Sequence, residues 1–304
     1  MKKIVHIRLE GGLGNQLFQF AFGYSVAKAN NAKIYLHKGL LKEEQKNQLE
    51  SFLNLEGILI RKLSNIENFI STLQIFIFRS MARLLRYHSD ELASKLCLVL
   101  GGFFSFSPRY KAISKKNSNS HYYVYGNWMS KKYFLDVESD IRKLIKPFKN
   151  TKYSLGVAKK MERTDSVAVH IRLGDYLDSR WSDALNVCGS NYFFDASRLL
   201  IDKIKSKPTL FIFSNSINDI NFIKKEYCFP DCEINYIYTG NDLEDLKLMS
   251  NCKNFILSNS TYGWWGEFFS KSKNTLAPKY WNDGRWDMTD IYNKKWIRVE
   301  NKKK

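Results

Sequence analysis

The sequence predicts an α/β protein built from two domains, with parallel sheets that helices cover on both faces. Short apolar stretches of strand length alternate with stretches of helical periodicity through most of the chain. Such alternation is typical of parallel strands joined by helical crossovers. The chain has 304 residues, enough for two hydrophobic cores, and its 15% aromatic content with only five prolines favours packed interiors over disorder.

The first domain is expected over residues 1–150. It opens with a strand at residues 3–9, a helix that begins near residue 15, and a second strand at residues 33–37. A turn that contains Gly11, Gly12 and Gly14 precedes the helix. Glycines at a helix N-terminus let the backbone approach a phosphate or a sugar, and a purely structural turn is the alternative. A dinucleotide site is not indicated, because Leu17 occupies the place of that motif's third glycine.

Residues 59–107 differ from the rest of this domain, because large apolar residues there are interleaved with basic ones. The basic residues that alternate with the apolar ones include Arg61, Lys62, Arg79, Arg83 and Arg86. A basic amphipathic helix can lie on an anionic membrane, or it can pack its apolar face on the domain core. No apolar run in the sequence approaches the roughly 20 residues that span a bilayer.

The first domain is expected to end with a strand at 122–125 and a helix that runs to about residue 145. A polar segment near residue 150 marks the boundary, and the second domain covers 151–304. Its strands are expected at residues 166–171, 209–213, 233–238 and 254–257, with a last strand around Leu276. Its helices are expected at residues 192–205, from 218, 242–249, and from 263.

Polar residues follow three of these strands, at Arg172, Ser214 and Ser258. Open α/β sheets bind ligands at the carboxyl ends of their strands, so one shared crevice is expected. His170 lies at the end of the first of these three strands, and Arg172 and Asp175 follow it. A guanidinium at that point can hold two phosphate oxygens at once. The alternative is a structural ion pair between Arg172 and Asp175.

The chain carries 48 basic and 30 acidic residues, a formal net charge of +18. Such a balance attracts nucleic acid, anionic membrane or phosphate-bearing substrates. The basic residues are dispersed and no nucleic-acid-binding signature is present, so nucleic acid is not expected as a partner. Five irregularly spaced cysteines and an N-terminus without an apolar run indicate a cytoplasmic protein, with peripheral association with the inner face of the membrane left open.

Several motifs occur together and in order. They are Gly11 to Gln19 (GGLGNQLFQ), His170 to Tyr176 (HIRLGDY), Phe213 to Asn215 (FSN), Asp242 to Cys252, and Ser258 to Gly266 (SNSTYGWWG). In these motifs the chain resembles the glycosyltransferase family 11 α-1,2-fucosyltransferases of bacteria. Two departures stand out. Leu173 replaces a second basic residue that many relatives carry, and residues 40–110 match no pattern.

The resemblance implies a glycosyltransferase-B architecture, with two Rossmann-like domains facing across a cleft. It also implies GDP-L-fucose as donor, the 2-hydroxyl of a galactose-terminated glycan as acceptor, and inversion at fucose C1 without a metal or other cofactor, in surface polysaccharide or O-antigen synthesis. The sequence favours metal independence on its own account, because it contains no Asp-x-Asp, the usual anchor for a divalent cation on a sugar nucleotide.

Roles follow for individual residues. Arg172 is expected to stabilise the leaving diphosphate, and the proposed bases are Asp175, His170 and, third, Glu10. The remaining expected substrate-binding residues are Gly12, Gly14, Asn15, Gln16, Phe213, Ser214, Asn215, Asp242, Ser258, Asn259, Ser260 and Thr261. Two other functions stay open. A nucleic-acid-binding protein would explain the charge, and a non-catalytic sugar-nucleotide-binding module would need the serines without Arg172.

Overall fold

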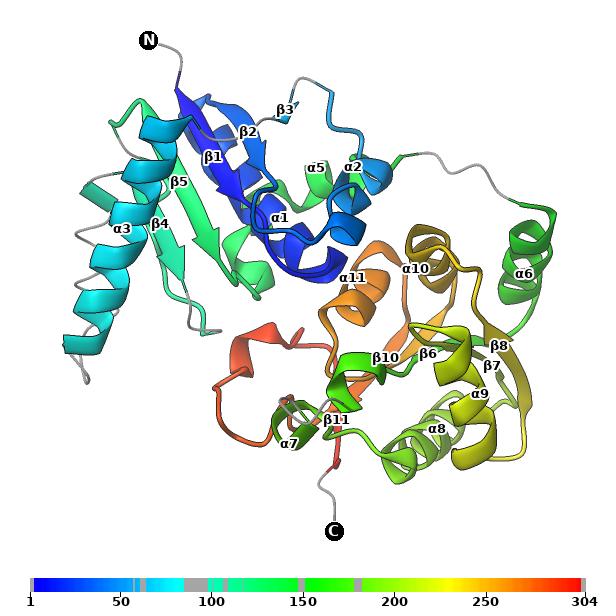
Figure 1. The fold of residues 1–304 in the computed structure, drawn as a ribbon. Coiled ribbons are helices and arrows are strands. Elements are labelled where there is room, and N and C mark those ends of the chain that lie inside the picture. Colours follow the sequence, from blue (N-terminus) through cyan, green and yellow to red (C-terminus); the bar gives the residue numbers. More distant parts are fainter. Residues whose placement is uncertain are drawn as a thin grey trace. The chain divides into compact units, whose positions relative to one another are not determined.

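The computed structural model describes residues 3–56, 58–60, 64–84, 98–99, 101–105, 109–116, 118–146, 151–177 and 182–301 (Figure 1). The chain forms two compact units. Unit 1 consists of Met1–Lys146 with Thr289–Ile291, and unit 2 of Pro147–Met288 with Tyr292–Lys304. In the described part of the chain each unit contains one sheet whose strands are parallel, so the predicted α/β class with parallel sheets is confirmed.

Unit 1 is built on a five-stranded sheet with the order β3-β2-β1-β5-β4. In that order the strands are Leu59–Ile60, Lys33–His37, Ile4–Arg8, His121–Gly126 and Gly102–Ser105. Its α-helices are α1 (Leu13–Asn30), α2 (Gln48–Phe52), α3 (Asn65–Leu84) and α5 (Glu138–Lys143). Its 3₁₀ turns are η1 (Glu43–Gln45), η2 (Lys131–Tyr133), η3 (Leu135–Val137) and η5 (Thr289–Ile291).

The two faces of this sheet differ in character, because successive residues of a strand point to opposite sides. Helix α1 packs on the apolar face that contains Ile7, so closely that a side chain on Gly23 would collide with Ile7. Helix α3 packs on the opposite face, where Arg8 donates a hydrogen bond of 2.8 Å to the Ser71 hydroxyl. That second face is polar and aromatic rather than aliphatic, and it carries His6 and its neighbours.

Unit 2 is built on a six-stranded sheet with the order β11-β10-β9-β6-β7-β8. In that order the strands are Ile297–Val299, Asn274–Pro278, Asn254–Leu257, Ser166–His170, Thr209–Phe213 and Glu233–Ile237. Its helices are α6 (Lys152–Arg163), α7 (Ser182–Leu185), α8 (Ser190–Ile204), α9 (Ile217–Glu226), α10 (Asp242–Ser250) and α11 (Thr261–Phe269), with the 3₁₀ turn η4 (Gly174–Leu177). Numbered within the unit, the strand order is 3-2-1-4-5-6, the Rossmann order.

Two sequence-based expectations about elements are wrong, and one helix was missed. Leu276 does not lie in the last strand, because β11 follows β10 and pairs with it. The helix expected to run to about residue 145 is broken into η2, η3 and the short α5. The break has a packing cause, since Tyr133 and Phe134 are buried against aromatic rings of α1, and Phe134 leaves the helical conformation (φ −136°). Helix α6, which follows the boundary segment, was not anticipated.

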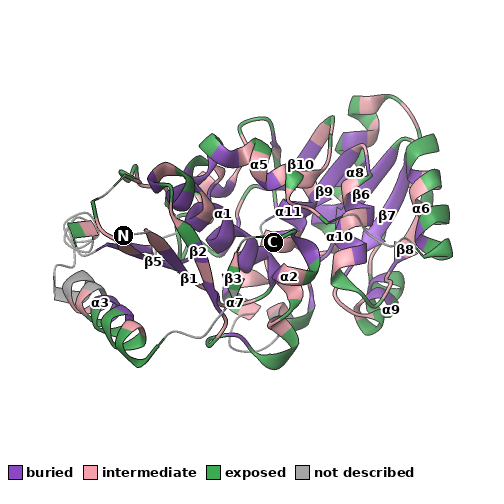
Figure 2. Cartoon of the chain, turned by 90° about the horizontal axis from the view of Figure 1, so that it is seen from above, coloured by how far each residue is buried: buried purple, intermediate pink, exposed green. Residues whose placement is uncertain are grey.

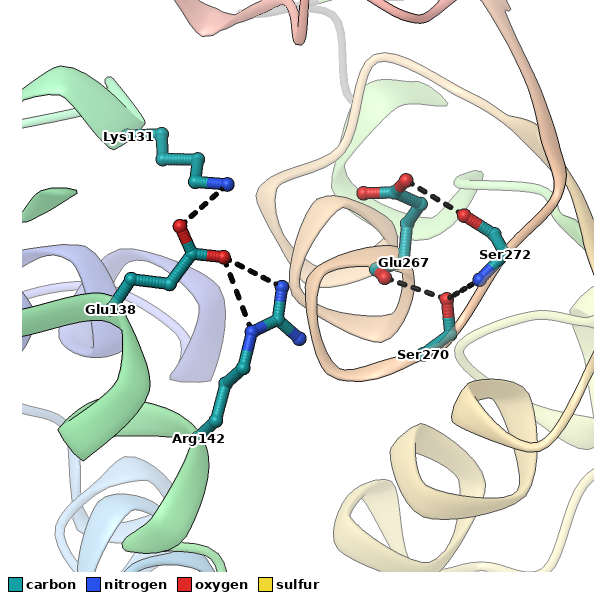
Figure 3. A network of polar contacts seen from close by, with 6 residues as sticks. All are labelled: Lys131, Glu138, Arg142, Glu267, Ser270 and Ser272. Atoms are coloured by element: carbon teal, nitrogen blue, oxygen red, sulfur yellow. Dashed lines mark hydrogen bonds and ion pairs between the residues drawn. The ribbon is translucent and has the colours of Figure 1, made fainter.

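Charged side chains stabilise α5, the last piece of the broken helix (Figure 3). Glu138, at the first position of α5, accepts hydrogen bonds from Arg142, which lies one turn later in the helix. Glu138 also forms an ion pair of 2.7 Å with Lys131. These contacts lower the pKa of the Glu138 carboxyl against the opposing effect of its partial burial.

In the described residues, no helix has both the length and the apolar character that crossing a membrane requires.

Candidate functional site

The carboxyl ends of β6 and β9 lie next to each other in the sheet of unit 2. After β6 the chain adds β7 and then β8 on one side of it, and after β9 the chain adds β10 and then β11 on the opposite side of the sheet. His170 ends β6 and is paired with Phe213 of β7 on one side and Leu257 of β9 on the other. The polar residues expected after three strands therefore follow three adjacent strands. A reversal of strand order is where open α/β sheets bind their ligands.

His170 is a buried residue whose ring is held from two sides. Its Nδ1 lies 3.2 Å from the Ser258 hydroxyl, and its ring packs near that of Tyr262. Burial, and then the charge of Arg172, lowers the pKa of His170 to about 3. The ring is therefore neutral near pH 7 and a very weak base. We therefore assign His170 a positioning role, in which it holds Ser258 and the start of α11. We do not assign it the role of a general base.

Because Gly263 has no side chain, the His170 ring can pack directly against the first turn of α11. A Cβ atom at this position would lie 2.9 Å from His170 Nδ1 and 3.1 Å from its Cγ, inside normal contact distance. Gly263→Ala is therefore expected to lower the free energy of unfolding by about 1–3 kcal/mol, because a buried ring and a helix start must move apart. Urea denaturation measures this change.

A matched control for that substitution is Gly156→Ala in α6. Apart from its chain neighbours and the backbone of its own helix, no described atom lies within 4 Å of a Cβ built on Gly156. This variant should be as stable as the parent or more so, because alanine favours a helix over glycine by about 1 kcal/mol. Equal stability of Gly263→Ala and the parent would contradict the packing described for His170.

Arg172 lies two residues beyond the end of β6. Its guanidinium stands 5.7 Å from the Tyr176 ring centroid, and its charge opposes the rise in the pKa of Asp242 and of Tyr262 that burial causes. Leu173, the departure from the family pattern, is buried in the apolar core of unit 2. A basic residue in place of Leu173 would be buried in this apolar core. The Asp175 side chain lies outside the described residues.

The start of α10 adds the carboxylate of Asp242 near this cation. Asn241 caps the helix by accepting hydrogen bonds from the N–H groups of Leu243 and Glu244. The Tyr262 hydroxyl donates to the Asp242 carbonyl oxygen, which ties α10 to α11. Partial burial raises the pKa of Asp242. Sequence reasoning did not single out Tyr262, although it lies within a motif that was recognised.

The N-terminus of α11 offers backbone donors at the same edge of the sheet. Ser260 is the N-cap residue, and its side chain makes no capping hydrogen bond. The Trp264 N–H is the first to bond inside the helix, to the Ser260 carbonyl at 3.0 Å. The N–H groups of the first turn precede the intrahelical hydrogen bonds and lie at the positive end of the helix dipole. This arrangement suits a phosphate.

The far end of α11 is fixed by a compact hydrogen-bond network (Figure 3). The Ser272 hydroxyl donates to the Glu267 carboxylate at 2.9 Å, and the Ser270 hydroxyl donates to the Glu267 carbonyl at 2.7 Å. The two tryptophans of the helix, Trp264 and Trp265, are both buried. Packing and hydrogen bonds thus hold the helix whose first turn faces the strand ends.

Other predicted residues of unit 2 have mixed roles. The Ser214 hydroxyl donates to the Ile171 carbonyl at 2.8 Å and so joins the ends of β6 and β7. The Asn259 amide nitrogen donates to two backbone carbonyls, those of Leu185 and Trp281, so both of its N–H groups are used within the fold. Phe213 is buried in the core. Asn215 differs, because its buried Oδ1 has no hydrogen-bond partner among the described residues, and such an acceptor can be satisfied by a ligand donor.

The glycine loop of unit 1 joins β1 to α1. Gly11 adopts φ +76°, which favours glycine, and Gly12 precedes the helix in an extended conformation. The N–H groups of Asn15 and Gln16 both bond to the Gly12 carbonyl. The Gln16 amide is buried and donates to the Gly11 carbonyl at 2.9 Å, so this side chain closes the loop. Gly14 is buried in the first turn of α1.

Glu10 stands between this loop and the neighbouring strand. The Tyr125 hydroxyl of β5 donates to Glu10 Oε2 at 2.7 Å. Gln19 of α1 accepts from the Glu10 N–H at 3.0 Å and donates to its carbonyl at 3.3 Å, which clamps the backbone. The carboxylate is therefore held at the carboxyl ends of β1 and β5. Sequence reasoning missed Tyr125 and Gln19, although Gln19 ends the recognised glycine motif.

A row of imidazoles crosses the α3 side of the same sheet. His6 Nδ1 lies 3.1 Å from His37 Nε2, and His6 Nε2 lies 2.9 Å from His121 Nδ1. Glu67 of α3 approaches His6 Nε2 at 3.8 Å. Within the described part of the chain, His6, Glu67 and His121 form one group that could hold a metal ion. The ring-to-ring hydrogen bond already uses both nitrogens, so a metal would have to break it.

Comparison with known proteins gives a family match and two curated relatives. The family described as Glycosyl transferase family 11 matches residues 4–300. The α-1,2-colitosyltransferase of Escherichia coli is 28% identical over 310 residues, covering 98% of this chain and 99% of that protein. The O-antigen biosynthesis glycosyltransferase WbnK, also of E. coli, is 28% identical over 130 residues, covering 40% of this chain and 41% of that protein.

Two solved structures share the fold at low sequence identity. A mutant of FUT1 from Arabidopsis thaliana in complex with GDP gives a TM-score of 0.51 at 12% identity, covering 91% of this chain and 70% of that chain. A glycosyl transferase of family 9 from Veillonella parvula gives a TM-score of 0.50 at 11% identity, covering 100% of this chain and 89% of that chain. At such identities the likeness concerns the fold alone.

Proposed function

The chain belongs to glycosyl transferase family 11, and from this premise we propose that it transfers L-fucose from GDP-L-fucose to the 2-hydroxyl of a terminal galactose in a surface glycan such as O-antigen. One observation carries the proposal. Arg172, Ser258 and the first turn of α11 follow β6 and β9, where the strand order of unit 2 reverses. A nucleoside diphosphate is the ligand that such an edge suits.

In this proposal unit 2 binds the donor. The diphosphate accepts hydrogen bonds from the first N–H groups of α11 and from the hydroxyls of Ser260 and Thr261. Arg172 pairs with the β-phosphate, and Asn215 accepts a hydrogen bond from a ribose hydroxyl or a base N–H. Ser214, Asn259 and Ser258 hold the strand ends and His170 in place, so they act through the fold rather than by contact with the donor.

The acceptor is assigned to unit 1, which carries the glycine loop and Glu10. The acceptor oxygen forms a bond to fucose C1 as the bond from C1 to the phosphate oxygen breaks, and the electron pair leaves with GDP. Attack from the opposite face inverts C1. Glu10 takes the proton of the attacking hydroxyl, and Arg172 stabilises the charge that grows on the β-phosphate.

Turnover of GDP-L-fucose with lactose, extended to a panel of β-galactosides, tests the proposed function. We expect GDP release that depends on the galactoside, and a fucosylated product with an α-1,2 linkage. Titration of GDP in a calorimeter separates the alternatives. Tight GDP binding without transfer to any galactoside would identify a sugar-nucleotide-binding module, and the absence of GDP binding would remove the donor assignment altogether.

A second donor has a specific observation in its favour, since the relative aligned over nearly the whole chain is a colitosyltransferase. Colitose is fucose without its 3-hydroxyl. A site that hydrogen-bonds that hydroxyl rejects the deoxy sugar by about 10⁴-fold, whereas an apolar pocket discriminates by only about 10- to 200-fold. The ratio of kcat/KM for GDP-L-fucose and GDP-L-colitose therefore decides which donor the chain uses.

Turnover is expected to persist in excess EDTA. The sequence has no Asp-x-Asp to anchor a cation on the diphosphate, and we assign that charge compensation to Arg172. Initial rates with EDTA, and after addition of magnesium, manganese or zinc, measure the effect. Loss of activity in EDTA that magnesium or manganese restores would contradict the mechanism. Loss that only zinc restores would point instead to His6, Glu67 and His121.

A further inference from the structure

Helix α3 buries two polar residues and Ile75 on its inner side, and it turns most of its large apolar side chains toward solvent. Ser71 and Gln74 are buried against the sheet of unit 1, and the Ser71 hydroxyl accepts a hydrogen bond from Arg8. Large apolar side chains occupy the opposite side. They are Ile66, Phe69, Ile70, Leu73 and Phe76, with exposed fractions of 73%, 68%, 37%, 45% and 66%. We call these five residues the α3 outer face.

The spacing of the α3 outer face makes it one continuous surface. Its residues recur at intervals of three and four, so they form a single stripe along more than two turns of helix. Figure 2 shows this helix largely exposed, in contrast to the buried strands of the sheet it covers. Isolated apolar residues on a protein surface are ordinary, but a contiguous stripe of two phenylalanines, two isoleucines and a leucine marks an interaction surface.

Charge decides among the partners that an apolar stripe could accept. The sequence from 68 to 89 contains no Asp or Glu, and Glu67 approaches His6 on the inner side of the helix. The stretch 61–86 carries five basic residues, and the whole chain has a net charge of +18. Two copies of such a chain would bring like charges together. An anionic bilayer attracts the same charges and accepts the apolar stripe.

We propose that the α3 outer face is a membrane-binding surface, with which the protein docks on the headgroup region of an anionic bilayer. The helix lies in the plane of the interface with Phe69 and Phe76 inserted among the acyl chains, and the net positive charge of the chain attracts the lipid phosphates. This docking is peripheral. It is independent of the proposed transfer reaction, because it uses none of the residues assigned to donor or acceptor.

Flotation of the purified full-length protein with vesicles tests the proposal. We expect binding to vesicles in which about one third of the lipid is phosphatidylglycerol, weak binding to pure phosphatidylcholine, and partial release at high salt. The double variant Phe69→Gln/Phe76→Gln should bind the anionic vesicles at least about tenfold more weakly. The matched control is Ile217→Gln/Phe222→Gln, which changes two apolar residues of α9 that are 52% and 46% exposed. It should bind as the parent does.

A second measurement needs no variant. Hydrogen exchange of the parent protein should slow in residues 65–77 when anionic vesicles are added, and not in α9. Failure of the parent to float with anionic vesicles at low salt overturns the proposal, as does an equal loss of binding in both double variants. A dimer in sedimentation analysis that Phe69→Gln/Phe76→Gln dissociates, without vesicle binding, would show instead that a second copy covers the α3 outer face.

Discussion

Replacement of Arg172 by alanine is expected to give a folded protein whose kcat falls about 100-fold or more. The guanidinium stands at the reversal of strand order in unit 2, where its charge already acts on His170, Asp242 and Tyr262. A preorganised cation gains most when negative charge develops on the departing phosphate, and the loss of one such group typically costs about 3 kcal/mol of transition-state stabilisation. The loss should therefore appear in kcat more than in the KM for GDP-L-fucose.

Arg172→Lys sharpens this test, because it keeps the charge but loses the planar fork that holds two phosphate oxygens. We expect it to recover only part of the lost kcat. Arg198→Ala, on an exposed position of α8, is the matched control and should leave kcat unchanged. Steady-state kinetics and circular dichroism of the three variants provide the comparison. A folded Arg172→Ala enzyme with a kcat near that of the parent would make Arg172 structural and would end the proposed mechanism.

The edge of unit 2 that we assign to the donor was predictable from sequence because each of its parts is local. β-branched and apolar runs form β6, β7 and β9, and the polar residues after them are brought together simply because parallel strands end on the same side. The structure places Arg172, Ser214 and Ser258 after these three adjacent strands, as expected. What sequence could not reveal is that Gly263 makes space for the His170 ring, since that contact joins residues far apart in the chain.

Helix α3 shows a second limit of sequence reasoning. Its apolar periodicity was equally compatible with core packing and with a membrane surface, because hydrophobic spacing defines a face but not the direction in which it points. The direction depends on the opposing sheet surface. There His6 and Arg8 require polar partners, and Ser71 with Glu67 supplies them. The membrane interpretation therefore remains a prediction, although the outward direction of the apolar stripe is now established.

The second large effect is expected for Glu10→Gln, with a fall in kcat of roughly 10²- to 10⁴-fold, the range that a positioned general base contributes. The substitution keeps the size of the side chain and its ability to accept a hydrogen bond from Tyr125, and it removes the charge that takes the acceptor's proton. Donor binding should be unchanged, because Glu10 belongs to unit 1 and the donor is assigned to unit 2. Rates with saturating GDP-L-fucose, together with GDP titration, measure both properties.

Two further variants separate a chemical role of Glu10 from a structural one. Tyr125→Phe removes the hydrogen bond of 2.7 Å that orients the carboxylate, so it should lower kcat by about tenfold and leave the base in place. Asp175→Asn tests the alternative base from the recognised motif of unit 2. If Glu10→Gln keeps most of its kcat while Asp175→Asn loses it, the proton goes to Asp175. Glu10 would then be a strand-end carboxylate whose task is to hold Tyr125, and the acceptor oxygen would have to be deprotonated from the donor side.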